Sequence, residues 1–111
     1  MTPEGLWSFE FLDNKEHRGG GVAVFYKNRV LGGNTGFTYI GEYLLKGDEI
    51  IIKVNIKRFI DDAPGVYKDE FNLSVKGKYH DLDFIVTGTP DDNEDFIMAI
   101  QCTRCEEISG N

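Results

Sequence analysis

Hydrophobic and polar residues alternate along most of this chain in short runs separated by Gly, Asn and Asp. Alternation with a period of two predicts β-strands with one buried face, because successive side chains of a strand point to opposite sides of the sheet. The clearest run is 49–58, where four aliphatic residues share one face: Ile50, Ile52, Val54 and Ile56. No segment shows a sustained apolar stripe at helical spacing. The pattern therefore predicts an all-β protein.

About eight such runs, each bounded by turn residues, are predicted as strands. They cover residues 5–12, 20–26, 30–31, 36–45, 49–58, 70–76, 82–88 and 95–104. The connection 60–69 contains two adjacent aspartates, a proline and a glycine, and is predicted as a long loop with at most a short helix. Antiparallel strands joined by short turns can pair first to last, which removes exposed sheet edges. We therefore expect a small closed barrel; a two-sheet sandwich is the alternative.

Length, charge and the ends of the chain narrow the class of protein. The 111 residues suffice for one domain, expected over 1–111 with a frayed polar tail at 106–111. The 12 Lys and Arg against 19 Asp and Glu give a net charge of −7, which argues against binding to nucleic acid or an anionic membrane. Residues 1–16 lack the features of a signal peptide, and no run has the length of a membrane span. We expect a cytoplasmic protein.

The chain has two cysteines, Cys102 and Cys105, which raise the alternatives of half a zinc site or a redox pair. Their odd spacing on a continuing strand puts the two thiols on opposite faces. The two histidines, His17 and His80, lie in separate polar segments without ligand spacing. A plain pair of thiols in a reducing compartment is therefore expected, with no metal and no cofactor.

An acidic turn precedes the last predicted strand and raises the alternative of a calcium site, with four carboxylates: Asp91, Asp92, Glu94 and Asp95. The turn lacks the glycine and the distant bidentate glutamate of a calcium-binding loop. A solvated hairpin tip, or an acidic patch that faces a partner, is expected instead.

Two further features bear on phosphate binding and on catalysis. The triplet 19–21 of glycines is followed by a strand pattern and by no Gly-Lys-Ser/Thr, so it predicts a β-bulge or a flexible start of a strand instead of a phosphate-binding loop. The serines and histidines form no recognisable nucleophile with a base, and we expect no enzyme. A hydrolase or isomerase with a carboxylate at a cavity mouth stays as a third alternative.

The first strand opens with Gly5-Leu6-Trp7, which is similar to the Gly-x-Trp opening of lipocalin-type barrels. In those barrels the tryptophan plugs one end, and a basic residue of the last strand packs across its ring. That resemblance implies a barrel-closing cation–π pair of Trp7 and Arg104. An ordinary core tryptophan is the alternative.

Four segments in order resemble the GrlR-type family of small bacterial regulators: Gly5-Leu6-Trp7-Ser8, Gly20-Gly21-Val22-Ala23-Val24, Arg29-Val30-Leu31-Gly32-Gly33-Asn34 and Phe37-Thr38-Tyr39-Ile40-Gly41-Glu42-Tyr43. The resemblance covers the first half of the chain in sequence and the second half in strand layout. It implies a lipocalin-like barrel that forms a homodimer and represses type III secretion genes by binding a transcriptional activator, with no enzymatic activity.

The family's prototype uses a run of four acidic residues before its strongest strand to face its partner. Here the run falls on 46–49, where Lys46 and Gly47 depart and Asp48 and Glu49 keep the charge. The resemblance therefore implies the same barrel with a different partner.

Two main functions follow. The first is a non-catalytic regulatory barrel that binds a basic protein, such as a transcriptional activator, through four carboxylates: Asp48, Glu49, Asp91 and Asp92. The second is a lipocalin-like carrier or sensor of a small apolar ligand. Its expected cavity residues are Trp7, Phe9, Phe11, Phe37, Tyr39, Ile52 and Val54.

Overall fold

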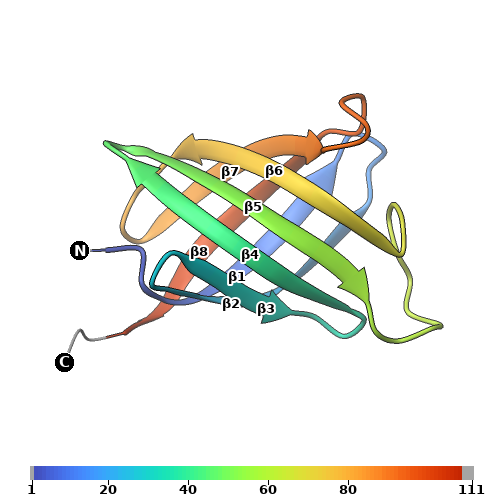
Figure 1. Ribbon diagram of the computed structural model, residues 1–111, viewed down its shortest axis with the longest axis horizontal. Helices are drawn as coiled ribbons and strands as arrows, with labels where there is room; N and C mark the ends of the chain where they lie inside the picture. The colour runs from blue at the N-terminus through green and yellow to red at the C-terminus, as the bar shows by residue number, and fades with distance from the viewer. Residues whose placement is uncertain (1, 109–111) are drawn as a thin grey trace.

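The computed structural model describes residues 2–108, which form a closed barrel of eight antiparallel strands paired in chain order, with β8 pairing back to β1 (Figure 1). The strands are β1 (Gly5–Asp13), β2 (Arg18–Tyr26), β3 (Arg29–Gly33), β4 (Phe37–Lys46), β5 (Glu49–Arg58), β6 (Glu70–Lys78), β7 (Asp83–Pro90) and β8 (Met98–Glu107). The described residues contain no helix. The prediction of an all-β closed barrel is confirmed, and the two-sheet sandwich is wrong.

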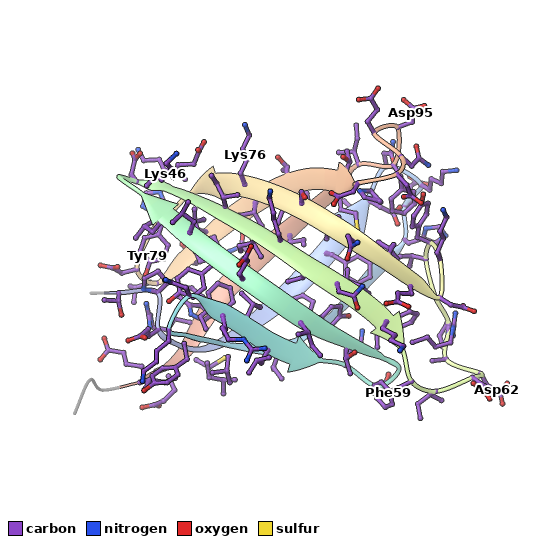
Figure 2. The ribbon with its side chains drawn as sticks, viewed as in Figure 1. Lys46, Phe59, Asp62, Lys76, Tyr79 and Asp95 are labelled. Atoms are coloured by element: carbon purple, nitrogen blue, oxygen red, sulfur yellow. The ribbon has the colours of Figure 1, made fainter. Side chains whose placement is uncertain are left out.

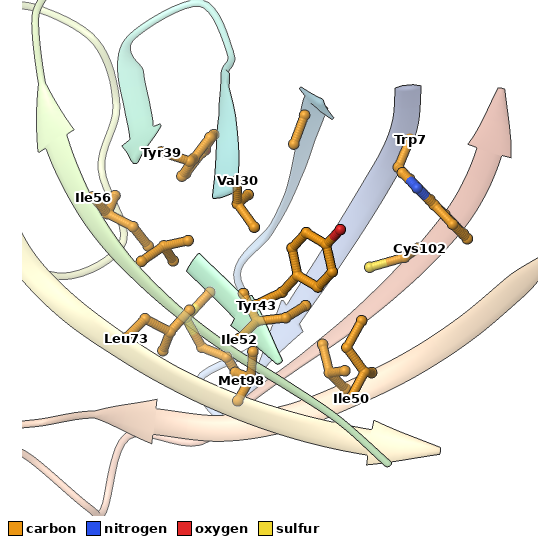
Figure 3. Packing of buried hydrophobic residues seen from close by; sticks show 14 of the residues in the cluster. Trp7, Val30, Tyr39, Tyr43, Ile50, Ile52, Ile56, Leu73, Met98 and Cys102 are labelled. Carbon is orange, nitrogen blue, oxygen red and sulfur yellow. The ribbon is translucent and has the colours of Figure 1, made fainter. Parts of the chain in front are cut away.

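The alternation along each strand separates the core from the outer surface. On β5 the four aliphatic residues predicted to be buried point inward, and Ile50 among them is 0% exposed. The same period buries Trp7 on β1, Tyr39 on β4 and Leu73 on β6. These side chains converge on the barrel axis, as the close view of the core shows (Figure 3).

Up-and-down connectivity sends successive connections to opposite ends of the barrel. One end, which we call the terminal end, holds the start of β1, the end of β8, and the turns at 27–28, 47–48 and 79–82. The other, which we call the loop end, holds the connections 14–17, 34–36, 59–69 and 91–97. Figure 2 shows Lys46 and Tyr79 at the terminal end and Asp62 at the loop end.

Residues 60–69 form the predicted long connection, with turns and bends and no helix. The predicted start and end of the last strand need correction. The last strand starts at Met98 instead of Asp95, because Phe96 lies in a turn where its amide donates to the carbonyl of Asn93. The strand then continues through Glu107. The predicted frayed tail is therefore wrong for residues 106–107, which pair with the start of β1, while 109–111 lie outside the described residues.

The glycine triplet at 19–21 does not form the predicted β-bulge. β2 pairs with β1 in regular register through all three glycines. A Cβ on Gly19 would lie 2.7 Å from the ring of Phe11, so glycine here makes room for an aromatic ring that covers the backbone. The irregularity falls between β1 and β8, where Leu6 pairs with Glu106 and Trp7 with Arg104. Cys105 is therefore the extra residue of a β-bulge.

Candidate functional site

The interior of the barrel contains an apolar cavity of about 110 Å³. All seven residues predicted from the sequence to line a cavity do line it: Trp7, Phe9, Phe11, Phe37, Tyr39, Ile52 and Val54. Further walls come from residues that the sequence analysis did not single out, among them Ala23, Val86 and Cys102. None of the described residues that line the cavity is charged. The cavity therefore suits a neutral, mostly apolar occupant.

One polar pair, Asn34 and Tyr39, interrupts this apolar wall. Asn34 lies in the β3–β4 turn, where its Oδ1 accepts hydrogen bonds from the amides of Gly36 and Phe37, each at 2.9 Å. These two bonds fix the orientation of the amide, so Nδ2 donates to the hydroxyl oxygen of Tyr39 at 2.7 Å. Burial raises the pKa of Tyr39 to about 12, so its hydroxyl stays protonated at neutral pH.

The loop end of the cavity is covered by residues 59–69, which we call the strap. Three consecutive strap residues, Pro64, Gly65 and Val66, line the cavity. Arg58 holds the strap near its base, because its Nε donates to Asp69 at 2.8 Å and its guanidinium lies 4.9 Å from the ring of Phe37. The strap is thus an ordered cover held by polar contacts.

The far side of the strap is joined to the β7–β8 turn. Tyr67 donates from its hydroxyl to Asp92 at 2.9 Å, and Lys68 forms an ion pair with the same carboxylate. The Lys68 ammonium holds the pKa of Asp92 below its usual range. The ring of Tyr67 also packs 4.8 Å from that of Phe96, which is 2% exposed. Phe96 therefore anchors the strap although it belongs to a turn.

The terminal end is closed by Trp7 and Arg104. The guanidinium carbon of Arg104 lies 4.5 Å from the centre of the Trp7 ring, so the expected contact is present. The indole Nε1 donates to the carbonyl of Pro3 at 2.8 Å. Arg104 also donates four hydrogen bonds, to the carbonyls of Thr2, Glu4 and Asp81 and to the hydroxyl of Tyr79. One side chain thereby joins the N-terminal segment, the β6–β7 turn and β8.

The two cysteines lie in different environments. Cys102 lines the cavity at 4% exposure, and burial raises the pKa of its thiol to about 12. Cys105 is exposed at the bulge. Within residues 2–108, no three His, Cys, Asp or Glu side chains gather closely enough to hold a metal ion.

The four carboxylates predicted to bind a partner lie at opposite ends of the barrel. Asp48 and Glu49 lie at the terminal end, where Asp48 is 3.9 Å from the ammonium of Lys78. Asp91 and Asp92 lie at the loop end, where Asp91 accepts from the hydroxyl of Ser74 and Asp92 holds the strap. The structure therefore forms two separate acidic sites and does not combine them into one surface.

The outer wall carries an apolar feature that the sequence analysis missed. Four residues on β1 to β4 are direct cross-strand neighbours and form what we call the outer apolar row: Leu6, Val24, Leu31 and Ile40. Leu31 is 42% and Ile40 is 48% exposed. On the same face Val22 and Leu44 are about half exposed. Finding the row needs the register of four strands, which no single run of the sequence contains.

Charged residues of both signs border the row, and at its β1 end Leu6 pairs with Glu106. On one side of the row, three residues are cross-strand neighbours: Arg29, Glu42 and Lys53. On β5 the row leads to Asn55, and Lys57 lies two residues further along that strand. The surface is hollowed beside Ile40 into a groove lined by Arg29, Glu42 and Lys53. This face therefore combines exposed apolar area with a charged border in which cations outnumber carboxylates, on an acidic protein.

No helix among residues 2–108 has the length and apolarity to cross a bilayer. Neither a scan against protein-family models nor a search of the curated proteins finds a match for this chain.

Proposed function

We propose that the protein is a non-catalytic regulatory barrel of the cytoplasm that acts by binding another protein through the outer apolar row. The observation that carries the proposal is the continuity of this row across four strands, with Leu31 and Ile40 at 42% and 48% exposure. Contiguous exposed apolar residues with a polar border are characteristic of protein interaction sites. The resemblance to GrlR-type regulators makes a transcriptional activator the candidate partner.

The border defines the chemistry of the partner. Three cations, Arg29, Lys53 and Lys57, and two carboxylates, Glu42 beside Arg29 and Glu106 beside Leu6, border the row. Such a border favours a partner whose apolar contact is flanked by carboxylates, since opposite charges raise the association rate and select the partner. The proposal thus keeps a protein partner but replaces the basic partner expected at the four carboxylates. Those carboxylates are divided between two ends, and Asp92 is already paired with Lys68.

Partner capture by variants of the purified protein tests the proposal. Leu31→Lys places a charge in the row at an exposed position and is expected to weaken capture of the partner by at least about tenfold, as for a central contact residue. Thr87→Lys is the matched control, because Thr87 is exposed on β7, away from the row. The double variant Asp48→Lys with Glu49→Lys tests the terminal acidic site.

The outcomes separate the two surfaces. The proposal expects capture to be lost in Leu31→Lys and retained in both other proteins. Loss in the double variant alone would return the site to the carboxylates. Equal capture by all variants would remove the row as a binding site.

A further inference from the structure

We propose that the internal cavity is a binding site for a small neutral molecule, about the size of benzene and mostly apolar, that accepts a hydrogen bond from Tyr39. This site is separate from the outer apolar row. It is argued from the size of the cavity, the chemistry of its wall and the free hydroxyl proton of Tyr39 on that wall.

The size of the cavity limits the ligand. Cavities that bind drug-sized molecules measure about 300–1,000 Å³, whereas an engineered apolar cavity of about 150 Å³ binds benzene. The cavity here measures about 110 Å³. A single small ring or a short branched chain fits this volume, and a fatty acid or a tetrapyrrole does not.

The wall requires an uncharged ligand. Its described residues are aromatic and aliphatic side chains with one amide, one phenol and one thiol, from Asn34, Tyr39 and Cys102. Burial raises the pKa of both Tyr39 and Cys102 to about 12, so the two acidic groups stay neutral. An ion placed here would lose its hydration without gaining a counter-charge.

The hydrogen bonds around Tyr39 define the polar group that the ligand needs. The hydroxyl oxygen of Tyr39 already accepts from Asn34 Nδ2, whose orientation is fixed by the amides of Gly36 and Phe37. Within residues 2–108, no protein acceptor takes the proton of the Tyr39 hydroxyl. A phenol that is held in place and has a free proton at a cavity wall is a donor for a carbonyl, ether or nitrile group of a ligand.

Access follows from the position of the strap. Pro64, Gly65 and Val66 form the wall at the loop end, so a ligand that enters from this end passes the strap. The terminal end is closed by Trp7 under Arg104.

The test compares two probes of nearly equal shape, cyclohexanone and methylenecyclohexane, of which only the ketone accepts a hydrogen bond. Each is titrated into the full chain, and binding is followed by methyl NMR signals of Val54 and Val86, two cavity residues on different strands. The titrations are repeated with Tyr39→Phe and with Tyr43→Phe. Tyr43 is the matched control, since it is a buried tyrosine of the same strand that does not line the cavity.

The expected result is that Tyr39→Phe weakens binding of cyclohexanone roughly three- to tenfold, the value of one neutral hydrogen bond, and leaves methylenecyclohexane unchanged. Tyr43→Phe is expected to change neither. Comparing each probe with itself cancels the difference in their hydration. Ala23→Leu fills part of the cavity and is expected to reduce binding of both probes, since Ala23 lines it.

Two results would overturn the proposal. Cavity methyl signals that do not shift with either probe would show that the cavity is not a site for small molecules. An equal effect of Tyr39→Phe on both probes would show that Tyr39 donates no hydrogen bond to the ligand. Because none of these variants touches the outer apolar row, either result leaves the proposed protein interaction to be judged by its own test.

Discussion

Replacing Arg104 by alanine removes the side chain that holds the terminal end of the barrel together. The change deletes four hydrogen bonds, three of them to backbone carbonyls, and the stacking of the guanidinium over the buried ring of Trp7. A backbone hydrogen bond from residue 104 to the carbonyl of Leu82 remains, so β8 keeps its path. The loss therefore concerns tertiary contacts and not the strand itself.

The magnitude follows from these contacts. Hydrogen bonds from a charged donor contribute about 1.5–3 kcal/mol each when buried. Arg104 is only partly buried, so in the alanine variant water can hydrogen-bond to some of the oxygens that lose the guanidinium, and this reduces the loss of stability. Stacking on a partly desolvated indole adds about 1 kcal/mol. We expect Arg104→Ala to lower the free energy of unfolding by about 3 kcal/mol, and Arg104→Lys by about 2 kcal/mol because lysine keeps the charge but not the planar fork.

Urea unfolding followed by tryptophan fluorescence measures this effect, because Trp7 is the one tryptophan of the chain and lies beneath the guanidinium. With an m-value of about 1.5 kcal/mol per M, the midpoint falls by about 2 M in the alanine variant. Arg18→Ala is the control, since Arg18 is exposed at the start of β2; its effect is expected within about 0.5 kcal/mol. If Arg104→Ala unfolds within about 0.5 kcal/mol of wild type, the assignment of Arg104 to barrel closure is wrong.

Four further predictions address other parts of the barrel. A thiol reagent is expected to modify Cys105 alone in the folded protein and both cysteines in urea, since only Cys102 is buried; rapid labelling of both before unfolding would contradict this. Burial raises the pKa of Cys102 from 9.0 to about 12, so the unfolded chain releases the thiol proton at lower pH than the folded protein does. The contribution of the buried thiol to stability is therefore complete below pH 9 and is lost as pH rises toward 12. Thermal unfolding measured from about pH 8 to about pH 11, where thiols titrate, should show a smaller decline of the melting temperature in Cys102→Ala than in wild type. Gly5→Ala is expected to cost about 2 kcal/mol or more in urea unfolding, because φ is +154° and a Cβ would lie 2.3 Å from the carbonyl oxygen of Glu106; a neutral result would refute that close approach. Lys68→Ala breaks the ion pair on the strap and should speed amide hydrogen exchange in 59–69, with little change in the global stability because the pair is exposed. Unchanged exchange would show that the pair does not hold the strap.

The inward half of this fold could be predicted from the sequence because burial follows the period of each strand. Val54 and Leu73 alternate with polar neighbours, and their positions inside the barrel follow from that alternation alone. The start of β8 could not be predicted in the same way. Phe96 continues the apolar pattern but lies in a turn, where its burial comes from contact with Tyr67 of the strap.

The candidate sites likewise combine features that follow from the strand period with features that depend on tertiary contacts. The apolar cavity wall follows from strand faces, whereas its polar pair depends on Asn34, a turn residue that resembles any other turn asparagine until its amide is seen to hold Tyr39. The outer apolar row depends on the register of separate strands, which places Leu31 beside both Val24 and Ile40. Such pairing is a tertiary property, so each residue alone resembles an unremarkable exposed position of a strand.

Site-specific photo-crosslinking from the outer wall tests the central claim most directly. The protein carries benzoylphenylalanine in place of Leu31 or, as the control, of Thr87, and is irradiated in the cells that produce it. The account predicts one major adduct from position 31 to a different protein, absent from position 87, and reduced when Lys53 and Lys57 are changed to glutamate. An adduct to a second copy of this chain would make the row a homodimer contact instead, and adducts that do not differ between the two positions would contradict the account.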